Sequence, residues 1–441
     1  MKHIVIVGNG IAGITAARHI RKLSNNKITI ISAESDHFYS RTALMYIFMG
    51  HMKYEHTKPY EDGFWKKNRL DLLRDYVEAV DVSQKTLKLQ RQGKFAYDIL
   101  IIASGSKSNK LGWPGQDLKG VQGLYNLQDL EAMEQTTKTA TRAVIVGGGL
   151  IGIEMAEMLL TRKIPVTLLI REENYWENVL PPEEAALVSR QIKSHHVDLR
   201  NKTELQEILS DANGAVASVL TKNGEEIPCQ LVGLTVGVSP AIDFLKGSTI
   251  KTDRGILVNR FFETNIEDIY AIGDCAQFIE PPIGRKAIEQ VWYTGRMHGE
   301  TLAYTICNQK VAYNPGPWFN SAKFMDIEYQ IYGEVSAQPQ AHEKHIYWEH
   351  ENGQQSIRIV YHVATRKVIG FNLMGVRYKH AVCNAWLENE AIITEVMQNL
   401  RHANFDPEFF KKYEEDVVHQ YNLMEPEQPI EVRKKKFWKI F

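Results

Sequence analysis

His3–Ala17 reads HIVIVGNGIAGITAA, and this stretch decides the fold. It opens with an apolar, β-branched run of strand length, and three glycines follow at the spacing G-x-G-x-x-G: Gly8, Gly10 and Gly13. Small and apolar residues follow, beginning with Ile11 and Ala12. A helix that packs closely under a sheet requires such residues. The glycines permit a tight turn, close approach of the backbone to a diphosphate, and close packing of helix on strand. We expect the diphosphate of a dinucleotide at the positive end of this helix.

A glycine loop alone also occurs in ordinary β-to-α turns, so the next strand matters. The apolar run Ile28–Ile31 ends near Glu34, about twenty residues beyond the glycines. In dinucleotide-binding units, a carboxylate at that separation in the sequence accepts hydrogen bonds from ribose hydroxyls. We also expect no domain and no signal peptide before the first strand.

Residues 142–170 repeat the pattern. The apolar run Ala143–Val146 leads into Gly147, Gly149 and Gly152, with Leu150 and Ile151 between them, and a strand Val166–Ile170 follows. Two such units predict two dinucleotides in one chain. A flavin in one and a nicotinamide in the other would allow hydride transfer between them.

The second unit lacks the acidic residue after its second strand. Ile170 takes that place and Arg171 follows, which favours the extra phosphate of NADPH. Glu172 and Glu173 would repel the same phosphate. The sequence therefore favours NADPH by a narrow margin over NADH.

Composition limits the remaining classes of function. The 441 residues imply two or three domains, and a net charge of −1 gives no indication of nucleic-acid binding. No apolar run is long enough to span a membrane, so we expect a cytoplasmic protein. The four cysteines (Cys229, Cys275, Cys307 and Cys383) form no C-x-x-C pair and no metal-ligand pattern, so we expect small buried side chains, neither a disulfide relay nor a metal site.

Other residues after predicted strands can reach a ligand. Arg41 lies either beside the phosphates or ring of the dinucleotide, or at the solvent end of a helix packed in the core. Ser104 and Gly105 follow a buried strand, and Gly237 closes another. Asp274 comes directly after a strand and Gly273, where it either contacts a ligand or caps a helix.

Four motifs in a fixed order carry a family resemblance: VGNGIAG, ILIIASGS, VGGGLIG and YAIGDCA. Over about residues 1–330 the chain resembles the FAD-dependent pyridine nucleotide-disulfide oxidoreductase superfamily, in particular its rubredoxin reductase, nitrite reductase and NADH oxidase-like branches. The resemblance implies an α/β fold with two Rossmann-like dinucleotide-binding domains, for FAD and NAD(P), and a C-terminal α+β interface domain. The expected boundaries are 1–112 with 246–316 for FAD, 113–245 for NAD(P), 317–425 for the interface domain and 426–441 for a tail.

The resemblance also implies roles for individual residues. Around FAD, Glu34 would meet the adenosine ribose, Val77 the adenine through its backbone, and Asp274 the ribityl chain. Ser104 and Gly105 would line the flavin, and a helix start would approach its ring with Glu289, Val291 and Trp292. The nicotinamide nucleotide would meet Gly147–Gly152, Glu154 and Gly237.

Departures from the family pattern narrow the expected activity. Thr42 stands where the oxidase and disulfide reductase branch has a redox cysteine, and a hydroxyl cannot cycle through a disulfide. Tyr46 stands where the ferredoxin reductase branch commonly has a lysine, and Glu177 where the glutathione reductase branch has a second phosphate-binding arginine. We therefore expect an NAD(P)H-dependent FAD oxidoreductase that passes electrons to an iron–sulfur or rubredoxin-like protein. A membrane-associated quinone reductase and a flavin-bound redox-sensing binding protein are the alternatives.

The C-terminal third has a different pattern of expected elements, with strands followed by helices. Successive strands are expected from residue 317, then helices around Ala381–Leu400 and from Asp406 onward. Trp318 and Phe319 either approach the flavin or pack in the core. The end, RKKKFWKIF, interleaves basic and aromatic residues, which suits either a peripheral membrane contact or a solvated tail. Sequence leaves a homodimer open.

Overall fold

The computed structural model describes residues 1–406, 408 and 411–432. Its chain divides into two compact units, which we describe separately: Met1–Leu169 with Glu204–Pro315, and Ile170–Thr203 with Gly316–Phe441. The predicted membrane-contacting tail, residues 433–441, lies outside the described residues. Within the described part, no helix has both the length and the apolar character needed to cross a membrane.

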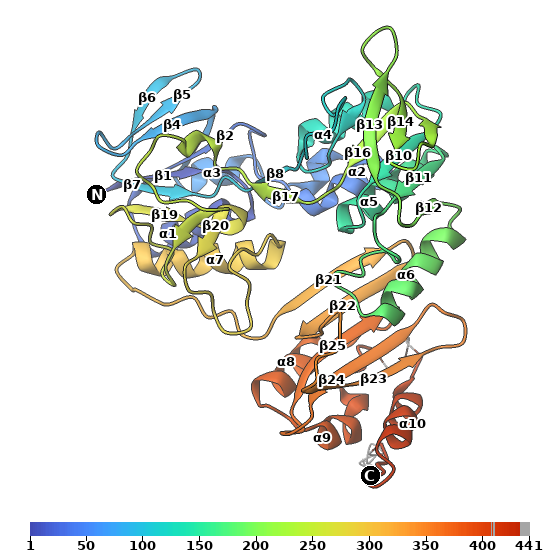
Figure 1. The fold of residues 1–441 in the computed structure, drawn as a ribbon. Coiled ribbons are helices and arrows are strands. Elements are labelled where there is room, and N and C mark those ends of the chain that lie inside the picture. Colours follow the sequence, from blue (N-terminus) through green and yellow to red (C-terminus); the bar gives the residue numbers. More distant parts are fainter. Residues whose placement is uncertain (407, 409–410, 433–441) are drawn as a thin grey trace. The chain divides into compact units, whose positions relative to one another are not determined.

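The first unit contains two parallel sheets, and the first of them lies beside the N-terminus (Figure 1). Its order is β19 (Ile269–Ala271), β7 (Ile99–Ile102), β1 (His3–Val7), β2 (Lys27–Ser32) and β3 (Leu70–Arg74). The inner strands β7, β1 and β2 are buried almost throughout, as strands covered on both faces require, whereas the edge strand β3 exposes Asp71 and Arg74. Helix α1 (Ile11–Leu23) connects β1 to β2 and so completes the predicted strand–turn–helix–strand unit.

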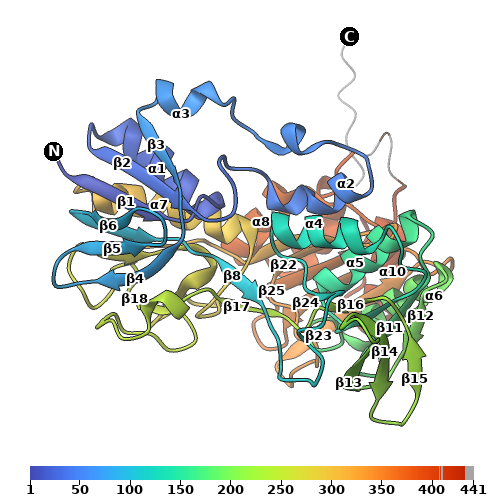
Figure 2. The same cartoon turned by 90° about the horizontal axis from the view of Figure 1, so that it is seen from above.

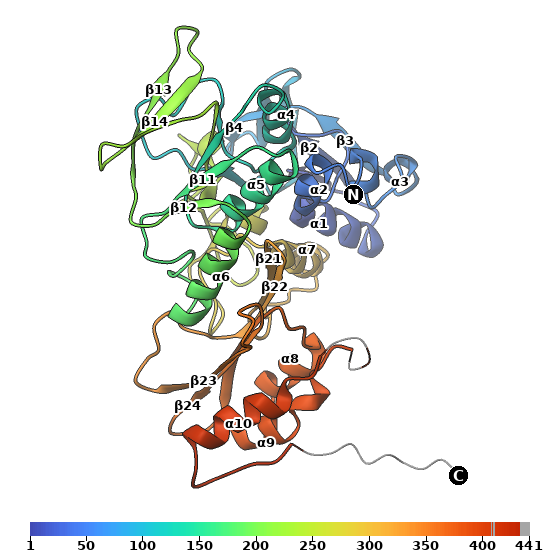
Figure 3. The same ribbon diagram turned by 90° about the vertical axis from the view of Figure 1, so that its right-hand side faces the viewer.

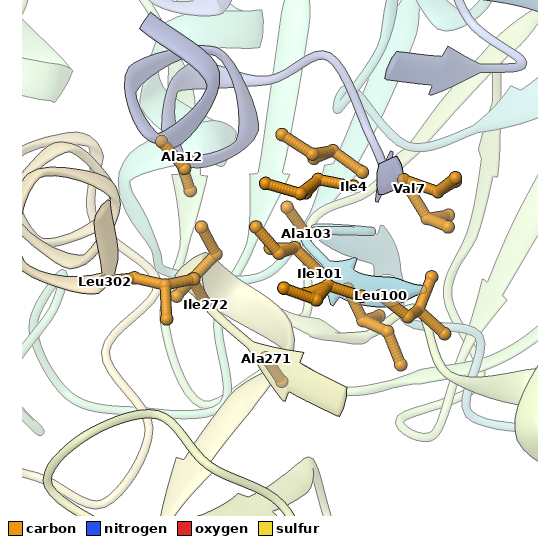
Figure 4. Close-up of a cluster of buried hydrophobic side chains, with 14 of the residues drawn as sticks. Ile4, Val7, Ala12, Leu100, Ile101, Ala103, Ala271, Ile272 and Leu302 are labelled. Carbon is orange, nitrogen blue, oxygen red and sulfur yellow. The ribbon is translucent and has the colours of Figure 1, made fainter. Parts of the chain in front are cut away.

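Two helices on this sheet approach each other closely. α1 lies against α7 (Trp292–Ile306), as Figure 2 shows from above. A Cβ atom added at Gly299 would lie 2.5 Å from the carbonyl oxygen of Ala12, so the glycine is needed for this contact. Apolar side chains of the strands, of α1 and of α7, including Ile4, Ile101 and Leu302, gather in one buried core (Figure 4).

A second parallel sheet in the same unit carries the second glycine motif. Its strands β11 (Val166–Leu169), β10 (Ala143–Val146), β16 (Leu231–Leu234) and β9 (Val121–Gln122) lie in this order. Helix α5 (Leu150–Thr161) connects β10 to β11, and α4 (Leu127–Thr136) precedes β10. The repeated β–α–β unit that the sequence predicts is therefore present.

Smaller elements complete the first unit. Antiparallel strands form two small sheets, β4 (Val77–Asp81), β5 (Thr86–Leu89) and β6 (Gly93–Ala96), and β13 (Leu205–Ser210), β14 (Val216–Thr221) and β15 (Glu226–Pro228). Strands β8 (Ser106–Ser108) and β17 (Val238–Pro240) pair antiparallel, and β18 (Ile256–Val258) pairs with β20 (Ala276–Phe278) in parallel. The short helices are η1 (Arg41–Ala43), α2 (Leu44–Phe48), η2 (Tyr54–Thr57), α3 (Gly63–Lys67), η3 (Asp243–Leu245) and η4 (Gly273–Cys275).

The second unit is built on an antiparallel sheet (Figure 3). The strand order is β21 (Phe319–Phe324), β22 (Ile327–Gly333), β25 (Val368–Met374), β24 (Ser356–His362) and β23 (Glu343–Glu349). Its other elements are α6 (Pro182–Ser194), β12 (Asp198–Arg200), α8 (His380–Glu388), α9 (Ile393–Gln398), η5 (Leu400–His402) and α10 (Glu414–Met424). The ring of Phe319 packs on His380, with 4.5 Å between centroids, as in the packed alternative for this residue.

A buried ion pair attaches α6 to this sheet. Arg358 of β24 donates from Nε and Nη2 to the two carboxylate oxygens of Glu184, at 2.7 and 2.8 Å, and from Nη2 to Glu183 at 2.6 Å. The side chains of Arg358 and Glu184 are 3% and 0% exposed. Losing one partner of such a pair typically costs about 3–5 kcal/mol, because the other charge stays buried.

The observed architecture confirms the predicted fold class, an α/β protein with two Rossmann-like parts and a C-terminal α+β part. The residue boundaries of the three domains stay a prediction. One helix start differs: the last helix was expected from Asp406, whereas α10 begins at Glu414. Its first turn contains three acidic side chains, those of Glu414, Glu415 and Asp416. Their negative charges interact favourably with the positive end of the helix dipole.

Candidate functional site

The first glycine loop has the backbone that the motif requires. Gly8 has a φ of +112°, and a Cβ there would lie 2.1 Å from the carbonyl oxygen of Ala103. A Cβ at Gly13 would lie 2.1 Å from the carbonyl oxygen of Gly8. At Gly10 a Cβ would meet no protein atom within 4 Å, so protein packing does not require glycine there. Gly10 is also the N-cap of α1 without a side-chain cap, which leaves the helix start accessible to an anion.

The second glycine loop repeats this geometry on β10 and α5. Gly147 has a φ of +121°, and a Cβ there would lie 2.5 Å from the carbonyl oxygen of Thr235. Gly149 is the N-cap of α5 without a side-chain cap, and its Cβ would have only Thr235 near it, at 3.9 Å. Leu150 and Ile151 start α5 half-buried. Gly237, with a φ of +89°, follows the neighbouring strand β16 and lies beside Asn109.

Glu34 lies after β2, as predicted, and its carboxylate already accepts several hydrogen bonds. Arg41 donates to both of its oxygens, at 3.1 Å from Nη1 and 2.6 Å from Nη2. The backbone N–H of Leu127 donates to Oε1 of Glu34 at 3.1 Å, and the hydroxyl of Tyr39 also donates to Oε1. Both carboxylate oxygens are therefore held by the protein, and a ribose hydroxyl would have to share one or replace a donor.

Arg41 joins this cluster to a tyrosine. Besides Glu34, its guanidinium donates to the backbone oxygen of Tyr125 at 2.5 Å and lies over the Tyr125 ring, 4.5 Å from its centroid. The ion pair places Arg41 beside a candidate nucleotide-binding carboxylate. In the core-helix alternative it would instead end a helix at the solvent, and α2 begins only at Leu44.

Asp274 is the second carboxylate of the site. Its Oδ2 accepts hydrogen bonds from the Tyr125 hydroxyl at 3.1 Å and from Ser106 Oγ at 3.2 Å. Burial raises the pKa of Asp274, while these two hydrogen bonds oppose the rise. Gln290 donates to Ser106 Oγ at 2.7 Å. Tyr125 therefore connects the Glu34–Arg41 cluster to Asp274.

Ser104 and Gly105 lie between the two carboxylates. A Cβ at Gly105, whose φ is +71°, would lie 2.8 Å from the Tyr125 hydroxyl. The hydroxyl of Ser104 is buried and has no nitrogen or oxygen partner among the described residues. Its polar contact is with the buried thiol of Cys275, which is a weak hydrogen-bonding group. A weakly bonded hydroxyl beside a glycine turn and a buried carboxylate suits a bound ligand with polar atoms along its length.

Near the start of α7, the carboxylate of Glu289 forms an ion pair within the protein. Glu289 accepts from Arg285 Nε at 2.7 Å and Nη2 at 2.6 Å, and from Thr294 Oγ1 at 3.1 Å. The two charged side chains are 3% and 7% exposed, so this pair braces the loop before the helix. Val291 is the N-cap of α7 and Trp292 its first residue.

His298, on α7, supports the turn that carries Asp274. Its Nδ1 accepts the backbone N–H of Gly273 at 3.1 Å. Burial among aromatic rings lowers the pKa of His298 to about 3, so it is neutral at physiological pH. A neutral imidazole is needed here because a protonated Nδ1 could not accept this bond.

The remaining predicted residues are placed as follows. Val77 is buried in β4, and Ile11 and Ala12 form the first turn of α1. Burial, with a contribution from Glu157, raises the pKa of Glu154 on α5 to about 7. In the second unit, Arg171 Nε donates to Glu172 at 2.8 Å, and Asn178 donates to the same oxygen at 2.9 Å.

Comparison with known proteins adds independent findings. A family model described as pyridine nucleotide-disulphide oxidoreductase matches residues 2–299. A rubredoxin-NAD(+) reductase of Ectopseudomonas oleovorans is 27% identical over 329 residues, covering 74% of this chain and 85% of its own. The biphenyl dioxygenase system ferredoxin–NAD(+) reductase component of Paraburkholderia xenovorans is 27% identical, covering 70% and 75%. The structure of an NAD-dependent persulfide reductase from A. fulgidus superposes with a TM-score of 0.84 at 22% identity, covering 96% and 83%, which is a likeness of fold.

Proposed function

Because the chain belongs to the pyridine nucleotide-disulphide oxidoreductase family, we propose that it transfers electrons from NAD(P)H to a small iron–sulfur or rubredoxin-like protein. The chain is an NAD(P)H-dependent FAD oxidoreductase. The two glycine loops in one unit carry the proposal, since each has the backbone geometry of a dinucleotide site.

The residues around the first loop suit FAD. Gly10 leaves room for a diphosphate, the buried Ser104 hydroxyl has only the Cys275 thiol as a partner for its side chain among the described residues, and Asp274 is a buried acceptor for hydroxyl groups. When bound, FAD supplies a ring that accepts a hydride and releases electrons one at a time. The protein's contribution is to hold and orient, because hydride transfer between two cofactors requires no protein acid or base.

A disulfide-linked mechanism has little support from the side chains. The four cysteines are free, and three of them are buried. Burial raises the pKa of Cys275, which follows Asp274, and so disfavours the reactive thiolate. Thr42, beside Arg41, has no redox chemistry of its own. Electrons leaving through a protein carrier, as the names of the rubredoxin and ferredoxin reductases imply for those proteins, are therefore the favoured route.

The remaining assignments rest on single features. NADH and NADPH both stay candidates, because the ion pair of Arg171 with Glu172 engages the guanidinium that would bind the extra phosphate. The four free cysteines, which are typical of reducing compartments, support the proposal of a cytoplasmic location. Membrane association and quinone reduction rest on the composition of residues 433–441 alone, and a redox-sensing role rests on the absent redox cysteine and the same tail. A homodimer rests on the resemblance of the C-terminal part to an interface domain.

Anaerobic stopped-flow absorbance tests the proposal. The FAD-loaded protein is mixed with NADH or NADPH, and oxidised rubredoxin, a [2Fe–2S] ferredoxin or a soluble quinone is then added. We expect the flavin band to bleach with at least one nucleotide and to return on addition of a protein carrier. A flavin that stays oxidised with both nucleotides contradicts the proposal, as does reoxidation by quinone alone.

A further inference from the structure

One cavity in the first unit has a strongly basic lining. It measures about 340 Å³ and lies where the C-terminal half of α1, the end of α3 and the start of β3 meet. Five cationic side chains line it, Arg18, Arg21, Lys22, Lys67 and Arg69, together with the ring of Phe64. The whole chain carries a net charge of −1, so this positive charge is local.

In the described part of the chain, none of these five cations forms an ion pair with a carboxylate. Among the residues that the structure describes, no Asp or Glu oxygen lies within 4.0 Å of any of their charged nitrogens. Nearby arginines are paired: Arg74 with Asp36 at 3.3 Å and Arg296 with Glu300 at 2.9 Å. Basic residues at the ends of α1 and α3 do complement the helix dipoles, but that effect does not require five cations around one hollow.

Hydrogen bonds to the backbone hold one of the five cations, Arg21, in place. Arg21 donates to four backbone oxygens, those of Asn68, Ser24, Asn26 and Arg69, at 2.7–3.1 Å. Burial and then the neighbouring charge of Arg69 lower the pKa of Arg21, while Asp71 opposes the shift. The other four cations line the same cavity.

One wall is aromatic. Phe64 stacks on Tyr60 with 4.5 Å between ring centroids, and the guanidinium of Arg18 lies 4.8 Å from the centroid of the Tyr60 ring. A planar apolar group could lie against Phe64 while negative groups face the lysines and arginines. The volume is at the lower end of the range for small-molecule sites, and it is too small for a protein segment with defined structure.

We propose that this cavity is a binding site for an organic polyphosphate of nucleotide size, separate from both glycine loops. Helix α1 has 13 residues, so at about 1.5 Å per residue the cavity and Gly10 lie at opposite ends of a helix about 20 Å long. A dinucleotide diphosphate at the helix start therefore cannot fill the cavity at its end. The inference goes beyond the proposed electron transfer and does not depend on it.

Arg69 provides a sharp test. It follows the C-cap of α3 with a φ of +54°, a conformation that Gly or Asn adopts more easily. Arg69→Asn should therefore keep or raise the melting temperature while removing one cation from the cavity. Lys22→Gln/Lys67→Gln removes two exposed charges, and Lys251→Gln, exposed and remote in sequence, is the matched control.

Isothermal titration calorimetry on the FAD-loaded protein, without NAD(P)H, measures binding of inorganic tripolyphosphate and of ATP. We expect saturable binding that weakens with added salt, with ATP tighter than tripolyphosphate because of Phe64. The double variant and Arg69→Asn should each weaken tripolyphosphate binding at least about tenfold, or about 1.4 kcal/mol, and the control should not.

Three outcomes would overturn the proposal: no tripolyphosphate binding, equal affinity in all variants, or retention on phosphatidylglycerol vesicles without tripolyphosphate binding. Reduction of the flavin by NAD(P)H, measured on the same samples, should be unchanged in every variant. A failure of this proposal is therefore distinguishable from a failure of the proposed electron transfer.

Discussion

The two glycine loops have the same backbone and different surroundings. Between its first two glycines the first loop carries Asn9, which is buried and donates to the backbone oxygen of Ser35 at 2.9 Å. The second loop has Gly148 at this position, which has no side chain to make such a bond. The first loop is thus tied to the segment that holds Glu34, and the second is not tied in this way.

The helices behind the loops differ too. α1 is held against α7 by glycines that let the two backbones approach, whereas α5 contacts the short helix α2. Under the proposed function, the two copies of this strand–loop–helix unit would bind two different nucleotides. We expect the braced first loop to retain its cofactor through turnover and the second to exchange its nucleotide.

The largest expected effect is on folding at the first loop. Gly8→Ala places a Cβ 2.1 Å from a backbone oxygen at a φ of +112°, so we expect a loss of at least about 3 kcal/mol in the free energy of unfolding. Gly147→Ala, with 2.5 Å to its nearest atom, should cost less. Urea denaturation followed by circular dichroism measures both. Losses below about 1 kcal/mol in both variants would show that the turns are not fixed as described.

A large effect on cofactor retention is expected at Asp274. Asp274→Ala removes the buried acceptor and leaves the Tyr125 and Ser106 hydroxyls without their partner. We expect FAD affinity to fall about a hundredfold, because a buried charged acceptor contributes about 1.5–3 kcal/mol. Fluorescence of released flavin on dilution measures it. Glu289→Gln, whose carboxylate binds Arg285, serves as a comparison that should alter stability more than FAD affinity.

A smaller effect is expected at the tyrosine between the carboxylates. Tyr125→Phe removes the hydroxyl that donates to Asp274 and accepts from the Ser106 N–H at 2.8 Å. The loss should be about 1–2 kcal/mol in FAD binding, seen as about tenfold faster flavin release. Release at the wild-type rate would mean that this hydrogen-bonded connection does not support the cofactor.

A pH dependence of stability is expected in α5, the helix that follows the second loop. Burial raises the pKa of Glu154 from an ordinary 4.5 to about 7, so the folded state binds the proton more tightly than the unfolded state. This contribution to stability is complete below about pH 4.5 and is lost as pH rises through about 7. The free energy of unfolding should therefore fall more between pH 5 and 8 in the wild type than in Glu154→Gln. Parallel pH curves for the two proteins would contradict this assignment.

The sequence was sufficient for the parts of the site that lie close to a motif. The two glycine loops, Glu34 and Asp274 follow strands whose apolar runs are visible, and each occupies the predicted place after its strand. Tyr125 was missed because its partner Asp274 is 149 residues away and no local pattern marks the contact. The pairing of Glu34 with Arg41 was missed for a related reason, since the segment between them is a loop.

The ion-pair partners of charged residues could not be predicted from the sequence. The family resemblance implied that Glu289 lies near the flavin ring, and its carboxylate binds Arg285, four residues earlier. Arg171 favoured NADPH by its position, and its pairing with Glu172 makes that preference weaker. In both cases the residue type was informative, but the partner depends on side-chain packing.

The central claim is that the first loop binds FAD and the second binds NAD(P)H. Gly10→Ala and Gly149→Ala test it most directly, because a Cβ at either position would fill ligand space without a close protein contact. Anaerobic titration of each purified protein with NADH and NADPH, followed at the flavin band, is the measurement. We predict that Gly10→Ala folds with little FAD, and that Gly149→Ala keeps FAD but needs at least about tenfold more nucleotide for half reduction. Full FAD content in Gly10→Ala, or an unchanged titration in Gly149→Ala, would contradict the account.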